Sequence, residues 1–75
     1  MSQKAITIQE LETKFEFHLV GEYRGWAFHL DEGNTELADM VRGQILGVLQ
    51  SMRLLGLDVE KIQGKALARV QKQAV

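Results

Sequence analysis

A long stripe of apolar residues in the second half of the chain is the feature that most limits how this sequence can fold. Its members recur at steps of three and four, the spacing of one helical face: Leu37, Val41, Ile45, Val48, Met52 and Leu55. Asn34 or Thr35 is placed to cap its start, and Gly56 is placed to end it in a left-handed conformation. The sequence therefore predicts a helix over about residues 35–55.

A second, shorter helix is predicted over about residues 58–73. Asp58 is suited to cap its first turn. Val59, Ile62, Ala66 and Val70 then repeat at helical spacing and define one apolar face.

The first half of the chain shows a different period. Apolar and polar residues alternate over 11–20, and alternate again over 24–31, which is typical of half-buried strands. If the two segments pair as a hairpin, Leu19 faces Trp26 and Phe17 faces Phe28 on the buried side. We therefore expect a β-hairpin over about residues 11–31 with its turn at residues 21–24.

Residues 5–8 leave an alternative open. Ile6 and Ile8 alternate as a third strand would, whereas Thr7 and Glu10 match a helix capping box. We expect an extended segment here, so the predicted fold class is α+β: a hairpin, possibly with a third strand, packed by two helices.

One domain over residues 1–75 is expected to have a small core. A chain of this size buries only about 60% of the surface exposed on unfolding. It has no cysteine, so disulfides and thiolate zinc sites are excluded as supports. Association with another copy is the remaining common way to stabilise so small a core, and we expect a homodimer.

Residues suited to catalysis or metal binding do not converge in the predicted fold. His18 and His29 fall on the same exposed face of the hairpin, with Glu16 opposite His29. Two histidines and one carboxylate are weak grounds for a metal site, and a solvated polar face is the simpler interpretation. The sequence also has no glycine-rich phosphate loop. We expect no catalytic residue, no metal and no cofactor.

The segment from Glu36 to Arg69, which reads ELAD and later GLDVEKIQGKALARV, resembles the last two helices of MazG-like nucleotide pyrophosphohydrolases. The resemblance covers under half of the chain and implies a helical, nucleotide-hydrolysing dimer that uses magnesium. The predicted helix between Asp39 and Gly56 is about one turn too long for that family. The family's upstream acidic metal motif also has no counterpart on a predicted helix. We therefore assign neither the activity nor the metal.

Two places are candidates for binding a partner. Gly43 and Gly47 lie four residues apart in the long helix and make a flat strip, either for packing within the chain or for a dimer interface. Tyr23 and Arg24 lie at the predicted hairpin tip, where an exposed aromatic residue can anchor a partner.

The charges are divided unevenly along the chain. Residues 1–40 carry eight acids and three bases, whereas residues 41–75 carry six bases and two acids. Such a division indicates an anionic partner, attraction between the halves, or the usual preference of acids for helix starts and bases for helix ends. Four bases share one face of the last predicted helix: Lys61, Lys65, Arg69 and Lys72.

The function that these observations favour is a small non-enzymatic interaction or regulatory protein that forms a homodimer and binds another macromolecule, which we expect to be a protein. The alternative is a regulator that binds nucleic acid through the basic stripe, although the net charge of −1 is unusual for that class. No stretch approaches the ~20 apolar residues of a membrane span, so we expect a cytoplasmic protein with no membrane contact.

Overall fold

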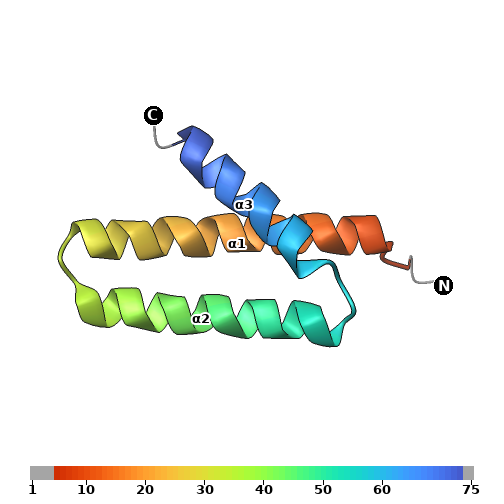
Figure 1. Cartoon of the computed structure of the whole chain (residues 1–75), viewed down its shortest axis with the longest axis horizontal. Helices are drawn as coiled ribbons and strands as arrows, with labels where there is room; N and C mark the ends of the chain where they lie inside the picture. Colours follow the sequence, from red (N-terminus) through yellow and green to blue (C-terminus); the bar gives the residue numbers. More distant parts are fainter. Residues whose placement is uncertain (1–4, 74–75) are drawn as a thin grey trace.

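Three α-helices make up the described part of the chain, residues 5–73 of a computed structural model, and that range contains no strand. They are α1 (Ile8–Asp31), α2 (Thr35–Leu54) and α3 (Val59–Gln73) (Figure 1). The predicted α+β fold is wrong, because the segment expected to form a hairpin is one continuous helix of 24 residues.

The start of α1 explains part of this difference. Thr7 is the N-cap, and its side-chain Oγ1 accepts a hydrogen bond of 3.0 Å from the backbone N–H of Glu10. Such a cap satisfies one of the backbone donors that a helix start leaves unpaired. Residues 5–7 have no regular secondary structure and Ile8 is the first helical residue, so the possible strand over residues 5–8 is also wrong.

The apolar face of α1 explains the rest. Leu11, Phe15, Leu19, Tyr23 and Trp26 follow one another at steps of four, four, four and three, and all five are buried or half-buried. The predicted hairpin also required Phe17 and Phe28 to be inside. They are 55% and 60% exposed, because they lie on the opposite side of the helix. The predicted turn at residues 21–24 is in the middle of α1.

Two glycines end the first two helices in the same way. Gly33 and Gly56 have φ angles of 73° and 76°, in the left-handed region that favours glycine. After α2, the Gly56 N–H donates to the Arg53 carbonyl and the Leu57 N–H donates to the Met52 carbonyl, both at 3.0 Å. This pair of hydrogen bonds is a Schellman motif, and it places Gly56 where the sequence predicts it.

The helices after α1 begin at the predicted caps. The Leu37 N–H donates to Asn34 Oδ1 at 3.1 Å, and the Lys61 N–H donates to Asp58 Oδ1 at 3.2 Å. Helices α2 and α3 thus lie within a residue or two of the predicted ranges, 35–55 and 58–73.

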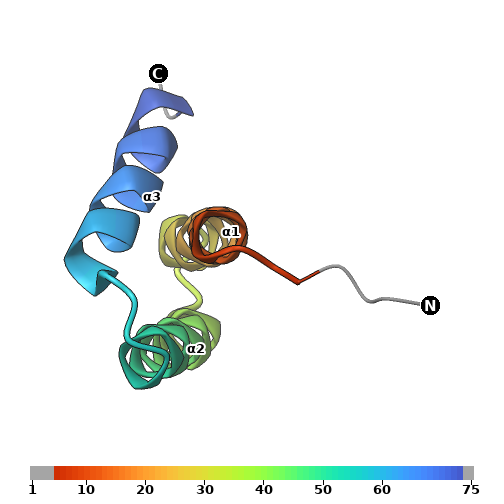
Figure 2. The same cartoon turned by 90° about the vertical axis from the view of Figure 1, so that its right-hand side faces the viewer.

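α1 and α2 form an antiparallel hairpin, and α3 crosses α1 obliquely (Figure 1). Figure 2 shows α1 and α2 nearly end-on, with α3 beside α1 and no helix on the opposite side of the hairpin. The core lies where the three helices meet, and its largest fully buried side chains are Leu19, Met52 and Ile62. Among residues 5–73, no helix covers one side of the α1–α2 hairpin.

The molecule is elongated for its size. Its principal extents are 49, 26 and 25 Å and its radius of gyration is 14.0 Å. A globular chain of this length has a radius of gyration of about 11 Å. A single small core joins the three helices, and much of their surface stays in contact with solvent.

Candidate interaction surfaces

A groove runs between α1 and α2 on the side of the hairpin away from α3. We call it the hairpin groove, and its volume is about 710 Å³. Its lining residues are Leu11, Lys14, Phe15, His18, Glu22, Gln44, Gly47, Val48 and Ser51. Leu11, Phe15 and Val48 are half-buried and form an apolar floor, and polar side chains from both helices flank it. The arrangement suits an apolar ridge with polar edges.

Of the two glycines predicted to bind a partner, one lines this groove and the other lies outside its lining. Gly47 lines the groove, and Gly43 is one turn earlier on the same strip of the helix. A Cβ atom added at either position would have nothing within 4 Å. Neither glycine is used for close packing within the chain, so that alternative is not what the structure shows.

The histidine and carboxylate of the groove form a weak pair. His18 Nε2 lies 3.5 Å from Glu22 Oε1, one helical turn further along α1, and the histidine side chain is more than half exposed. Pairs of this kind contribute little in water. Glu16 does not oppose His29, as the hairpin prediction required, because it faces α3 instead. Within residues 5–73, no three His, Cys, Asp or Glu side chains gather closely enough to hold a metal ion.

A second exposed surface lies on the far side of α1. Phe17, Arg24 and Phe28 recur at steps of seven and four and are all exposed, and we call this strip the outward face of α1. Arg24 is thus accessible, although it is in a helix and not at a hairpin tip.

Tyr23 is placed differently from its neighbour. The prediction that it lies at an exposed turn is wrong, because it is half-buried in α1. Its hydroxyl accepts a hydrogen bond of 2.9 Å from Gln63 Nε2 on α3. This side chain joins two helices of the chain.

Acids of α1 pair with bases of α3. Glu16, only 8% exposed, accepts a hydrogen bond from Arg69 Nε, and Glu12 Oε1 lies 3.3 Å from Lys61 Nζ. The Arg69 guanidinium also lies over the Phe17 ring, 4.9 Å from its centre. Of the explanations for the uneven charges, attraction between the two halves is therefore visible in these contacts.

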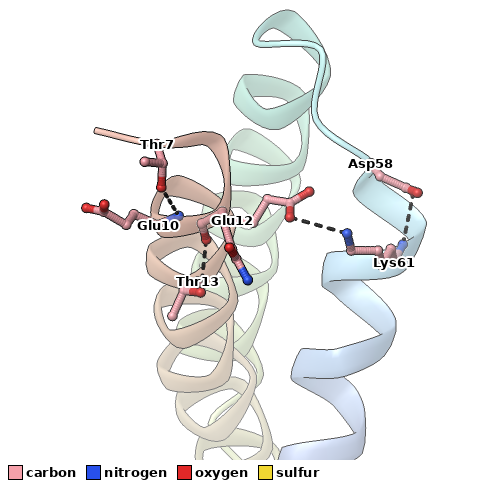
Figure 3. A network of polar contacts seen from close by, with 7 residues as sticks. Thr7, Glu10, Glu12, Thr13, Asp58 and Lys61 are labelled. Atoms are coloured by element: carbon pink, nitrogen blue, oxygen red, sulfur yellow. Dashed lines mark hydrogen bonds and ion pairs between the residues drawn. The ribbon is translucent and has the colours of Figure 1, made fainter. Parts of the chain in front are cut away.

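Figure 3 shows that Lys61, in the first turn of α3, makes two polar contacts. The backbone N–H of Lys61 donates to the Asp58 cap, and its side chain reaches across to Glu12 of α1. At the same end of α1, Thr7 caps the helix and the Thr13 hydroxyl donates to the carbonyl of Gln9.

These ion pairs reduce the free positive charge of the basic stripe on α3. Two of its four members, Lys61 and Arg69, are engaged by carboxylates of α1. Lys65, Arg69 and Lys72 line a hollow of about 740 Å³ at the α1–α3 contact, but Glu16 lines it too. The hollow therefore combines opposite charges.

The acids of the upstream segment and those of the ELAD stretch lie in separate parts of the fold. The upstream segment is helical, contrary to the prediction used against that resemblance. Its Glu12 and Glu16 are nevertheless occupied by bases of α3, whereas Glu36 and Asp39 are exposed in the first turns of α2. In the described part of the chain these acids do not gather into a magnesium site.

Comparison with protein-family models, with curated proteins and with solved structures gives no match. Over residues 5–73, none of the three helices is both long and apolar enough to cross a bilayer.

Sequence reasoning missed most of the hairpin groove. The sequence predicts a strand for Leu11, Lys14, Phe15 and His18, which would place neighbouring residues on opposite faces, and a turn for Glu22. The signal that could have found them was present: the Thr7 capping box and the repeat of Leu11, Phe15 and Leu19 at steps of four.

Proposed function

We propose that the chain is a small non-enzymatic interaction module that forms a homodimer and binds another macromolecule, most simply a protein. One observation carries the proposal, namely the number of large apolar side chains that stay exposed. Among the described residues they are Ile6, Ile8, Phe17, Phe28, Leu30, Met40, Leu46, Leu54, Leu55 and Leu67. Exposed apolar area of this extent is typical of protein–protein contact surfaces.

The total surface supports the same proposal. The chain exposes 5754 Å². A compact monomer of 8.5 kDa would expose about 4,650 Å² by the usual scaling with mass, so the excess is about 1,100 Å². A stable interface buries about 800 Å² on each partner. Association could therefore cover the surplus.

One interface cannot cover every apolar side chain. Phe17 and Phe28 lie on the outward face of α1, whereas Met40 and Leu54 lie on the side of α2 that carries Gly47. These surfaces are on different sides of the hairpin. We therefore infer two binding events, one with a second copy and one with a different macromolecule.

Nucleic-acid binding is the weaker alternative. The acids of α1 reduce the positive charge of the stripe on α3, and counterion release from phosphates depends on that charge. We keep a cytoplasmic location within the proposal, since a cysteine-free chain suits a reducing compartment.

Sedimentation equilibrium over a range of concentrations tests the dimer. We expect twice the chain mass of 8.5 kDa at high concentration and dissociation on dilution. A strict monomer at the highest concentration would contradict the proposal.

The second binding event is tested by affinity capture with two baits, the natural chain and a Phe28→Asp variant. Phe28 is 60% exposed, so the variant should keep its fold. We expect a macromolecule that binds the natural chain and is lost from the variant. Identical capture by both baits would remove the outward face of α1 from the proposal.

A further inference from the structure

We propose that the second copy docks in the hairpin groove, with α1 against α1 and α2 against α2 of the partner subunit, each pair antiparallel. The inference rests on the proposed dimer and adds its geometry. The two-fold axis lies across the hairpin, level with His18 and Gly47, which line the centre of the groove. Two hairpins then form a four-helix arrangement, and both α3 helices stay on the outside.

The open side of the hairpin has the shape that such docking needs. Figure 2 shows no helix on this side, and the half-buried Phe15 and Val48 form the groove floor. Because Gly43 and Gly47 carry no side chain and have empty space before them, another α2 helix can approach this strip closely.

The charged side chains with which α1 lines the groove are complementary to those of a second copy related by this two-fold axis. Lys14 and Glu22 both line the groove, and each is four residues from His18, on opposite sides of it. When α1 packs antiparallel to α1 of a second copy, Lys14 meets Glu22 of the partner subunit, and the same pair recurs by symmetry. The polar edges of the groove are thus matched by a second copy of themselves.

The residues of α2 are matched in the same way. Met40 and Leu54 are each seven residues from Gly47, so Met40 meets Leu54 of the partner subunit twice. These side chains are 54% and 80% exposed in the single chain. At the axis Gly47 meets Gly47 of the partner subunit. Larger side chains at this position would keep the two α2 helices apart.

The available area agrees with a second copy as the occupant. A standard interface buries about 800 Å² on each copy, which the surplus of about 1,100 Å² per chain can supply while leaving area for the outward face of α1. The groove face holds few formal charges, as expected for the centre of an interface.

A pair of matched glycine substitutions tests the site. Gly47→Gln places a side chain on the axis, and Gly64→Gln places the same side chain on the exposed side of α3, far from the groove. A Cβ at either position meets nothing within 4 Å, so both variants should fold. By sedimentation equilibrium we expect Gly47→Gln to weaken the dimer at least about 100-fold, as interface centres do, and Gly64→Gln to leave it unchanged.

A charge exchange tests the orientation. Lys14→Glu and Glu22→Lys should each weaken the dimer about tenfold, because each change places like charges together at two symmetric positions. The combined variant Lys14→Glu, Glu22→Lys should return to within about threefold of the natural chain. Circular dichroism at low concentration checks that each variant keeps its helices.

The outcomes separate the two proposals. If the natural chain dimerises and Gly47→Gln dimerises equally well, the second copy is not in the hairpin groove, and the proposed function stands. If the glycine variant dissociates but the charge exchange gives no recovery, the antiparallel pairing is overturned. A natural chain that never dimerises ends both proposals.

Discussion

α1 takes part in two interfaces, and their side chains differ in kind. Between α1 and α2 the contact is apolar, and within residues 5–73 no side-chain hydrogen bond or ion pair joins these helices. Between α1 and α3 the apolar contact is accompanied by three polar ones, which link Glu12 with Lys61, Glu16 with Arg69, and Tyr23 with Gln63.

The difference shows how each helix is positioned. Apolar burial has no preferred direction, so the α1–α2 hairpin is positioned by its three-residue connection and by the shapes of its side chains. Hydrogen bonds and ion pairs are directional. We infer that they fix where α3 crosses α1, since α3 has little contact with α2.

Shortening Leu19 should have the largest effect, because this side chain belongs to the core shared by all three helices. We expect Leu19→Ala to lower the free energy of unfolding by about 2–5 kcal/mol, from lost burial and the cavity left behind. Urea unfolding at a fixed protein concentration measures it. The control Leu46→Ala removes an exposed side chain and should change stability by less than about 0.5 kcal/mol.

Removing the partner of a buried carboxylate should have the next largest effect. Arg69→Met leaves Glu16 buried without its base, and we expect a loss of about 1–2 kcal/mol, reduced from the fully buried case because Arg69 is half exposed. Amide exchange should show the loss of protection mainly in α3. Adding Glu16→Gln should recover part of the stability, and Lys65→Met is the matched control. Equal loss of protection in α2 and α3 would contradict the difference between the interfaces.

The smallest effect is expected at the Tyr23–Gln63 hydrogen bond. Tyr23→Phe removes the acceptor of Gln63 Nε2 and should cost about 0.5–1.5 kcal/mol. A double-mutant cycle with Gln63→Leu measures the coupling between the two side chains. Additive effects of the two changes would mean that this contact does not help to hold α3.

The ends of the helices could be predicted from the sequence better than the type of the first element. Local chemistry alone determines these helix ends. The side chains of Asn34 and Asp58 accept hydrogen bonds at helix starts, and Gly56 can adopt a positive φ at a helix end. These interactions are formed within a few residues and need no knowledge of the fold.

The period of α1 could not be decided from alternation alone. Leu11, Phe15 and Leu19 fit both a period of two and steps of four, whereas Phe17 and Phe28 fit only the period of two. The hairpin prediction places both phenylalanines in the core, whereas the structure exposes both. Large exposed aromatic residues weaken the rule that apolar residues lie inside, and here they mark a surface.

The candidate surfaces were foreseen in part. The glycine strip of α2 could be found because two glycines within a well-predicted helix are conspicuous. The opposite wall of the groove required α1 to be a helix, and the ion pairs of α3 required knowing which face of α1 it crosses.

Asn34 makes one hydrogen bond to each of the first two helices. Its backbone N–H donates to the His29 carbonyl at the end of α1, and its side chain caps α2. A residue inserted beside it would separate the hydrogen bond to His29 from the cap on Leu37, so the two contacts could no longer be made by one residue. The length of this connection therefore bears on the end of one helix and on the start of the next, and lengthening it should cost about 1 kcal/mol, the usual value of a lost cap.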